Sequence, residues 1–131
     1  MPRAVRFAHY GPVDVLTAVE VPRPVPAAGE VIVEVVSAGI NLGEIEIREG
    51  FMRQRWPATF PSGQGSDFAG RVVELGAGAS GVTAGEEVIG FTNGRCSQAD
   101  YVAVPAGQLT VKPAGVDWDQ AGGLYVAGAT A

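Results

Sequence analysis

The chain has 131 residues and a mass of 13.5 kDa, which is the size of one domain. Because 47% of its residues are hydrophobic and only 18% are charged, the composition excludes a disordered chain. The net charge of −5 repels phosphate groups, so we expect neither a nucleic-acid partner nor an anionic membrane. The start of the chain lacks the apolar stretch of a signal peptide, and we expect a soluble cytoplasmic protein.

Cysteine and histidine are scarce. Cys96 is the single cysteine, so an internal disulfide is excluded. His9 is the single histidine, and these two residues cannot assemble the ligand sets of common structural zinc sites. We therefore expect a protein without zinc.

Glycines and prolines, 19 and 9 in number, divide the sequence into short segments in which apolar and polar residues alternate. Segments of this kind, rich in Val, Ile and Phe, are typical of strands separated by turns. Because they are short and evenly spaced, they favour an antiparallel barrel or sandwich over alternating βαβ units. The predicted strands are Ala4–His9, Leu16–Val21, Val31–Ser37, Phe68–Leu75, Glu87–Phe91, Ala99–Val104 and Leu109–Lys112.

One segment in the first half breaks the strand pattern. Asn41 is a suitable N-cap for a short helix over Leu42–Glu49. Glu44 and Arg48 lie four residues apart, a spacing that supports a helix. Gly50 is expected to end it.

A second helix is predicted near the end of the sequence. Asp117, followed three residues later by Gln120, resembles a capping box, and no strand alternation follows from Ala121 onward. The last residues hold no basic final turn and no polar tail before Ala131. We therefore expect a truncated C-terminal helix in a chain that continues in a longer protein.

The stretch Gly76–Gly81 matches the spacing G-x-G-x-x-G of dinucleotide-binding loops, and Asp100 lies about twenty residues further on. Such a loop must open a helix whose N–H groups face the pyrophosphate. Here it leads directly into the predicted strand Glu87–Phe91, which leaves no room for a helix. We interpret the stretch as a glycine-rich turn that binds no cofactor by itself.

Other candidate catalytic residues have simpler explanations. Cys96 has no nearby base, and a small buried residue explains it equally well. His9, at the end of a predicted strand, is expected to be structural or exposed. Two acidic pairs are expected to be solvated turn residues: Glu86 with Glu87, and Asp117 with Asp119. The residues alone therefore name no certain catalytic group.

Two features could form a binding site. Asn41 lies where a strand gives way to a helix, a place where polar side chains point into clefts, although a helix cap explains it too. Phe51, Trp56 and Phe60 occur in an irregular stretch rich in Arg and Pro. They could line a substrate pocket for a flat apolar ligand or merely cover the core.

Five segments carry a family resemblance. They are Gly11-Pro12 with Val15-Leu16; Gly39-Ile40-Asn41 with Glu44, Arg48 and Gly50; Pro61 to Gly70; Gly85-Glu86-Glu87-Val88; and Asp100-Tyr101-Val102. In this order they resemble the N-terminal, GroES-like catalytic domain of medium-chain dehydrogenases/reductases, in particular the zinc-independent quinone oxidoreductases related to ζ-crystallin. The resemblance covers the whole chain and implies a mainly β, partly open GroES-like barrel with short helices.

The resemblance also implies a function. It implies hydride transfer from NADPH to a quinone or activated alkene, in a cleft between residues 1–131 and a Rossmann cofactor domain expected after residue 131. Asn41 would hydrogen-bond near the nicotinamide or the substrate, and Thr130 in the last helix would contact the nicotinamide side of the cofactor. Asn41 and Ser66 stand where zinc-dependent relatives carry zinc ligands, so no zinc is implied. Without the Rossmann domain the fragment is expected to be inactive.

Four positions depart from the family pattern and leave the acceptor open between quinone and enoyl reduction. They are Leu42, Glu44, Glu46 and Met52. The chain could also be an enoyl-reductase domain of a larger synthase, or a stand-alone GroES-like binding or assembly module without enzymatic activity. Such a module would associate through the apolar Leu124-Tyr125-Val126. Exposure of this segment predicts a homodimer.

Overall fold

The segments between the glycines and prolines form strands in the computed structural model, which describes residues 1–125. The smaller sheet has three strands in the order β2-β1-β4, and the larger has five in the order β7-β3-β5-β6-β8. Every named strand pair is antiparallel. The bounds are β1 Arg3–Phe7, β2 Thr17–Glu20, β3 Glu30–Ala38, β4 Ser62–Gly63, β5 Asp67–Leu75, β6 Glu87–Phe91, β7 Tyr101–Pro105 and β8 Leu109–Val111.

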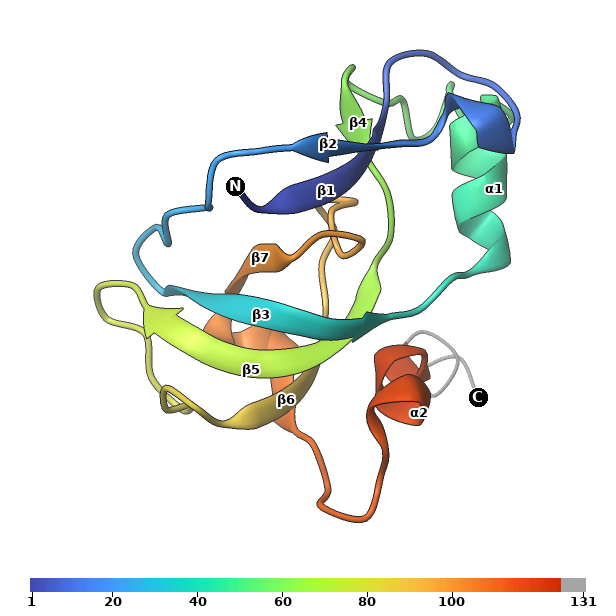
Figure 1. Cartoon of the computed structure of the whole chain (residues 1–131). Coiled ribbons are helices and arrows are strands. Elements are labelled where there is room, and N and C mark those ends of the chain that lie inside the picture. The colour runs from blue at the N-terminus through green and yellow to red at the C-terminus, as the bar shows by residue number, and fades with distance from the viewer. Residues whose placement is uncertain (126–131) are drawn as a thin grey trace.

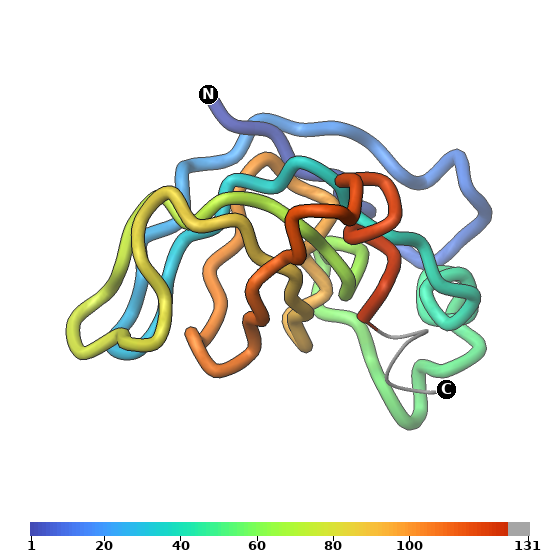
Figure 2. The backbone as a smooth tube through the Cα atoms, turned by 90° about the horizontal axis from the view of Figure 1, so that it is seen from below, coloured from blue at the N-terminus to red at the C-terminus, as the bar shows by residue number. Residues whose placement is uncertain are grey.

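Two α-helices and two single turns of 3-10 helix complete this part of the chain. They are α1 Leu42–Glu49, α2 Trp118–Gly122, η1 Val13–Val15 and η2 Ala106–Gln108. Both α-helices lie toward the same end of the sheets (Figure 1), while the turn between β5 and β6 projects from the opposite end (Figure 2). That turn holds Gly78 and Gly81 at φ +74° and +91°. It joins neighbouring antiparallel strands, so the prediction of a glycine-rich turn is confirmed.

Each predicted strand is present, with bounds that differ by at most two residues. The first ends at Phe7 instead of His9, and the sixth begins at Tyr101 instead of Ala99. Strand β4 was not predicted, because two residues are too few to show an alternating pattern. The mainly β, antiparallel fold class is confirmed.

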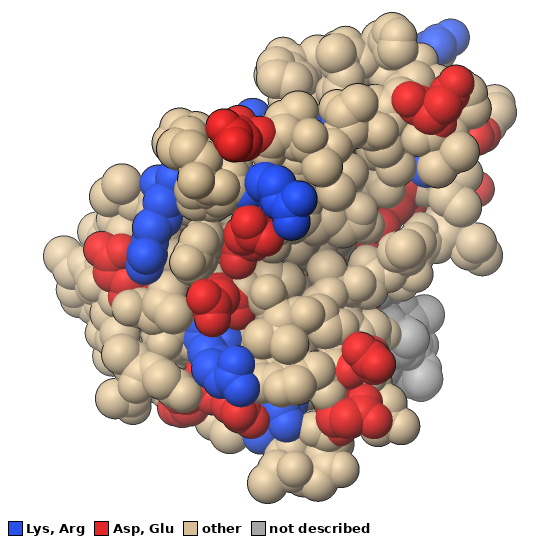
Figure 3. Space-filling model, in the orientation of Figure 1, with Lys and Arg blue, Asp and Glu red and all other residues tan. Residues whose placement is uncertain are grey.

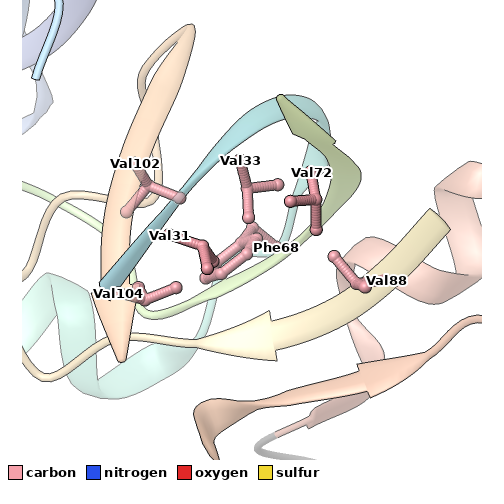
Figure 4. Packing of buried hydrophobic residues seen from close by; sticks show 7 residues of the cluster. All are labelled: Val31, Val33, Phe68, Val72, Val88, Val102 and Val104. Carbon is pink, nitrogen blue, oxygen red and sulfur yellow. The ribbon is translucent and has the colours of Figure 1, made fainter. Parts of the chain in front are cut away.

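The core lies on one face of the larger sheet, where side chains from four strands interdigitate (Figure 4). Alternate residues of a strand point to the same face, so Val31 and Val33 of β3 reach this core together. Phe68 at the start of β5 fills its middle and is fully buried. Burying each such side chain contributes roughly 1.5–3 kcal/mol. The other members are Val72, Val88, Val102 and Val104.

A second, smaller cluster covers the opposite face of β5 and β6. Ala69 and Ile89 pack there against Ala121 of α2, with Val116 and Trp118 beside them. This contact places α2 against the larger sheet.

The two sheets meet along a line that we call the seam, formed by residues 3–5 of β1 and residues 98–100. The Val5 N–H donates to Gln98 O at 2.9 Å, and the Asp100 N–H donates to Arg3 O at 2.8 Å. The Arg3 N–H donates to Asp100 Oδ2 at 2.8 Å, and Ala4 forms an isolated bridge with Ala99. This narrow connection leaves the barrel partly open, as expected.

Helix α1 has the predicted ends. Asn41 takes the N-cap backbone conformation and Gly50 the left-handed C-cap conformation, at φ +87°. The side chains expected to pair along it have other partners instead: Arg48 lies 3.7 Å from Glu49 and donates to Gly11 O, while Glu44 turns toward the sheets.

Helix α2 begins as predicted and ends earlier than predicted. The Gln120 N–H donates to Asp117 Oδ1 at 2.8 Å, which confirms the cap. The sequence predicts a helix that continues toward Ala131, but α2 ends at Gly122 and Gly123 forms its C-cap. Glycine interrupts the helix here because it adds no side-chain contacts and costs backbone entropy. Leu124 and Tyr125 are helical again.

Charged side chains of both signs are interspersed on the face shown in Figure 3. Among the charged residues of the chain, Arg71 pairs with Glu87 at 3.5 Å and Arg23 with Glu74 at 3.8 Å. In residues 1–125, no helix has the length and apolarity to cross a membrane.

Candidate functional site

Polar side chains from three separate parts of the chain meet beside the start of α1. Asn41 Nδ2 donates to Asp67 Oδ2 at 3.0 Å and lies 3.4 Å from Glu44 Oε2. Gln98 Nε2 donates to Glu44 Oε1 at 3.2 Å. We call Asn41, Glu44, Asp67 and Gln98 the amide–carboxyl cluster. Strand β5 and the segment before β7 thus converge on the first turn of α1.

The two carboxyl groups of this cluster are removed from water. Asp67 is fully buried and Glu44 is 6% exposed. Burial raises the pKa of Glu44, and the charge of Asp67 adds to this rise. Hydrogen bonds from the Asn41 side chain and from the backbones of Asn41 and Ser66 oppose it. Since Glu44 reaches back to the N-cap backbone, it also supplies half of a capping box.

The Asn41 amide has a fixed orientation. Its Nδ2 group is held by carboxyl oxygens, and its side chain makes no helix-cap hydrogen bond. Within residues 1–125, its Oδ1 atom has no hydrogen-bond partner, and the residue is only half-buried. The oxygen can therefore accept a hydrogen bond from an N–H or O–H group of a ligand.

A cavity of about 20 Å³ adjoins the cluster, lined by Glu44, Gln64 and Ser66 among others. Gln64 is 7% exposed, and its Oε1 atom has no partner within the described part of the chain. A cavity of this size with polar walls has room for about one water molecule.

The predicted aromatic residues do not form one cluster. Phe60 packs edge-on against Phe7 and Tyr10, with ring centroids 6.0 and 5.0 Å apart, and so helps to cover the core. Trp56 lies under the Arg55 guanidinium at 4.8 Å. Phe51 is 77% exposed and makes no ring contact in residues 1–125. Their role in a substrate pocket stays a prediction.

The remaining candidates have simple placements, and Thr130 lies outside the described residues. His9 is exposed. Burial raises the pKa of the Cys96 thiol, and contact with Thr92 and the charge of Arg6 partly oppose this. In the described range, no three His, Cys, Asp or Glu residues are grouped so as to hold a metal ion.

Sequence reasoning missed Asp67 and Gln98. Asp67 is the first residue of β5, where a charged residue next to buried neighbours could have been noticed. Gln98 carries no such signal, because it lies 54 positions from the residue to which it donates.

The comparison with protein families matches residues 27–125 to the alcohol dehydrogenase GroES-like domain. The chain is 36% identical over 98% of its length to the chloroplast envelope quinone oxidoreductase homolog of Arabidopsis thaliana, covering 40% of that protein. It is 33% identical over 95% of its length to the NADPH-dependent alkenal/one oxidoreductase, chloroplastic, of the same organism, covering 34% of it.

Comparison with solved structures points to the same family. The crystal structure of Escherichia coli quinone oxidoreductase complexed with NADPH matches with a TM-score of 0.90 and 30% identity, over 98% of this chain and 38% of that one. The chain thus spans about two fifths of the length of the quinone oxidoreductases it matches.

Proposed function

This chain belongs to the alcohol dehydrogenase GroES-like domain family, in its zinc-independent quinone oxidoreductase branch, and from that membership we propose that it forms the substrate side of an NADPH-dependent oxidoreductase. The reaction is transfer of a hydride to a quinone or an activated alkene. A Rossmann unit following residue 131 holds most of the cofactor, and residues 1–131 alone are inactive.

The observation that carries this proposal is the fixed amide of Asn41. Two carboxyl groups hold its Nδ2 atom, so its Oδ1 atom is presented as an acceptor at the surface of the site. An acceptor held in one orientation binds and orients a ligand without losing side-chain entropy on binding. This fits the carboxamide N–H groups of a nicotinamide, or a hydroxyl group of its ribose.

The surroundings of Asn41 fit the same purpose. Ile40 and Leu42, its neighbours in sequence, are 76% and 82% exposed. Leu124 is 47% exposed and follows Gly123, which packs closely against Gly39. Exposed apolar surface around a polar group indicates a site that another unit covers. A covering Rossmann unit would exclude water from the reacting groups.

When bound, NADPH supplies the reducing hydride, and the protein supplies binding and orientation. The residues of this chain that would contact it are Asn41 and, in the C-terminal segment, Thr130. The acceptor would lie on the side of Phe51, Trp56 and Phe60. The names of relatives include both quinone and alkenal/one oxidoreductases, which supports these two acceptor classes.

The test is a kinetic comparison in the longer protein that includes the Rossmann unit. Oxidation of NADPH is followed with 1,4-benzoquinone and with methyl vinyl ketone as acceptors. Asn41→Ala should raise the KM for NADPH or for the acceptor by roughly threefold to tenfold, as expected for one lost hydrogen bond. Asn93→Ala is the matched control, because Asn93 is an exposed asparagine.

Thermal unfolding of both variants shows whether each has folded, and only folded variants are compared. Unchanged constants in the Asn41 variant would remove this residue from the site. If the longer protein oxidises NADPH with neither acceptor, the oxidoreductase proposal is wrong, and a binding or assembly module becomes the better description.

A further inference from the structure

A cleft of about 590 Å³ opens between the smaller sheet and the segment before β7. Its size falls in the usual range for small-molecule sites. Arg6 of β1 and Arg95 contribute the charged groups of its lining, and Cys96 lies beside them. Within residues 1–125, no aspartate or glutamate lines this cleft.

Close backbone packing brings the two arginines together. Arg6 lies directly opposite Gly63 in the pairing of β1 with β4. On its other side Gly63 packs against the Arg95 backbone so closely that a Cβ atom at residue 63 would collide with the Arg95 carbonyl oxygen. Gly63 therefore lets two positively charged residues approach one place.

The charge of Arg6 is not neutralised. In the part of the chain that the structure describes, its guanidinium has no hydrogen bond and no ion pair, although the residue is half-buried. In contrast, Arg23, Arg48 and Arg71 each pair with a glutamate. Within residues 1–125, Arg3, Arg53 and Arg55 also lack an ion pair, but these side chains are exposed, whereas a half-buried cation without an acidic partner is costly to desolvate.

Arg95 has an unusual backbone. Its φ is +54°, the left-handed region that residues other than glycine seldom adopt, and its Nη1 group donates to Pro57 O at 3.0 Å. One edge of the guanidinium is thus fixed to the wall, while the group keeps further N–H donors. Residues held in such conformations cluster at ligand sites.

The rest of the lining holds both polar and apolar residues, the polar ones being Thr59, Ser62, Asn93, Gln98 and Tyr101. It includes four prolines, Pro22, Pro24, Pro57 and Pro61, and the valines Val5 and Val102. Proline fixes φ, so these walls lose little entropy when a ligand binds. The cleft therefore offers apolar surface together with guanidinium groups.

We propose that this cleft binds a small organic carboxylate with an apolar body, whose carboxylate is held by Arg6 and Arg95. A guanidinium matches the planar geometry of a carboxylate with two parallel hydrogen bonds. Such binding does not depend on oxidoreductase activity, so the two proposals can fail separately.

The test uses naphthalene-2-carboxylate and its uncharged counterpart naphthalene-2-methanol as probes of the purified 131-residue chain. Calorimetry should give a dissociation constant for the carboxylate below about 1 mM and binding of the alcohol at least about tenfold weaker. Arg6→Gln should weaken carboxylate binding about tenfold, since it removes the charge. Arg95→Asn, which tolerates the left-handed conformation, should do the same. Arg53→Gln is the matched control, because Arg53 is exposed and outside the cleft.

Cys96 gives a second readout, because it is the single cysteine and lines the cleft. Saturating carboxylate should slow its alkylation by N-ethylmaleimide in the native chain and not in the Arg6 variant. The proposal is overturned if the carboxylate does not bind, if the alcohol binds equally well, or if Arg53→Gln weakens binding as much as Arg6→Gln. Activity of the longer protein plays no part in these outcomes.

Discussion

The buried Glu44 carboxyl group shares the Asn41 amide with Asp67. Burial raises the pKa of Glu44 above its ordinary value of 4.5, so the folded chain binds this proton more readily than the unfolded chain does. The stability that the bound proton gives is present at low pH and is lost as the pH rises above the unfolded value. The free energy of unfolding should therefore fall as the pH rises above 4.5, and Glu44→Gln should reduce this dependence.

Urea unfolding at a series of pH values measures this effect. Glu46→Gln is the control, because Glu46 is an exposed glutamate of the same helix. If the free energy of unfolding depends on pH in the same way in the native chain and in the Glu44 variant, Glu44 ionises in the folded chain as it does in water.

At the residue scale, the sequence predicts which individual residues matter better than it predicts their contacts. Asn41 could be singled out because a strand gives way to a helix beside it, and the family resemblance points to the same place. That its amide would lie between two carboxyl groups could not be foreseen, because Asp67 is 26 positions away. The sequence left open whether Asn41 is a helix cap or a binding-site residue. The structure shows that its backbone takes the N-cap conformation of α1, while its side chain makes no cap hydrogen bond.

Helix α2 rests on the end of β3 through glycines. A Cβ atom at Gly122 would collide with Ser37 Oγ and lie 2.7 Å from Ser37 Cβ. We expect Gly122→Ala to push α2 away from the sheet and to cost about 1–3 kcal/mol of stability, as overpacking does. Denaturant unfolding measures the cost. Fluorescence of Trp118, whose ring contacts both Arg71 and Lys112, reports the displacement.

The matched control for this variant is Gly115→Ala, because a Cβ atom there would meet nothing within 4 Å. This change should leave stability nearly unchanged. Equal losses in both variants would mean that close packing of α2 contributes nothing.

The elements themselves were largely predictable, because glycine and proline mark their ends. Strand β6 has the bounds predicted for it, and α1 begins and ends at the predicted residues. The end of α2 was missed because Gly123 stands among other small residues and offers no distinctive pattern. Which strands pair, and that β4 joins β1, depends on contacts distant in sequence.

For the whole molecule we propose self-association when the 131-residue chain stands alone. Leu124 is exposed, together with Ile40 and Leu42, whereas Tyr125 stacks on Phe91 at 4.1 Å, and Val126 lies outside the described residues. Light scattering should show a dimer for the native chain and a monomer for Leu124→Glu, because a charge there opposes burial. Val25→Glu, at a residue 83% exposed elsewhere, should remain dimeric. A native monomer at high concentration would contradict the proposal.

The seam between the two sheets also sets how the molecule opens. A few backbone hydrogen bonds near Arg3, Val5 and Asp100 join the smaller sheet to the larger one, while the valine core lies within the larger sheet. Regions with few buried apolar contacts open at a lower free energy than the core does. We therefore predict that the smaller sheet unfolds as a separate cooperative unit, and that in deuterium the amides of Val5 and Asp100 should exchange before that of Val33. Each such opening would uncover the cleft beside Arg6 from the side of β1, so that ligand entry and partial unfolding would share one movement.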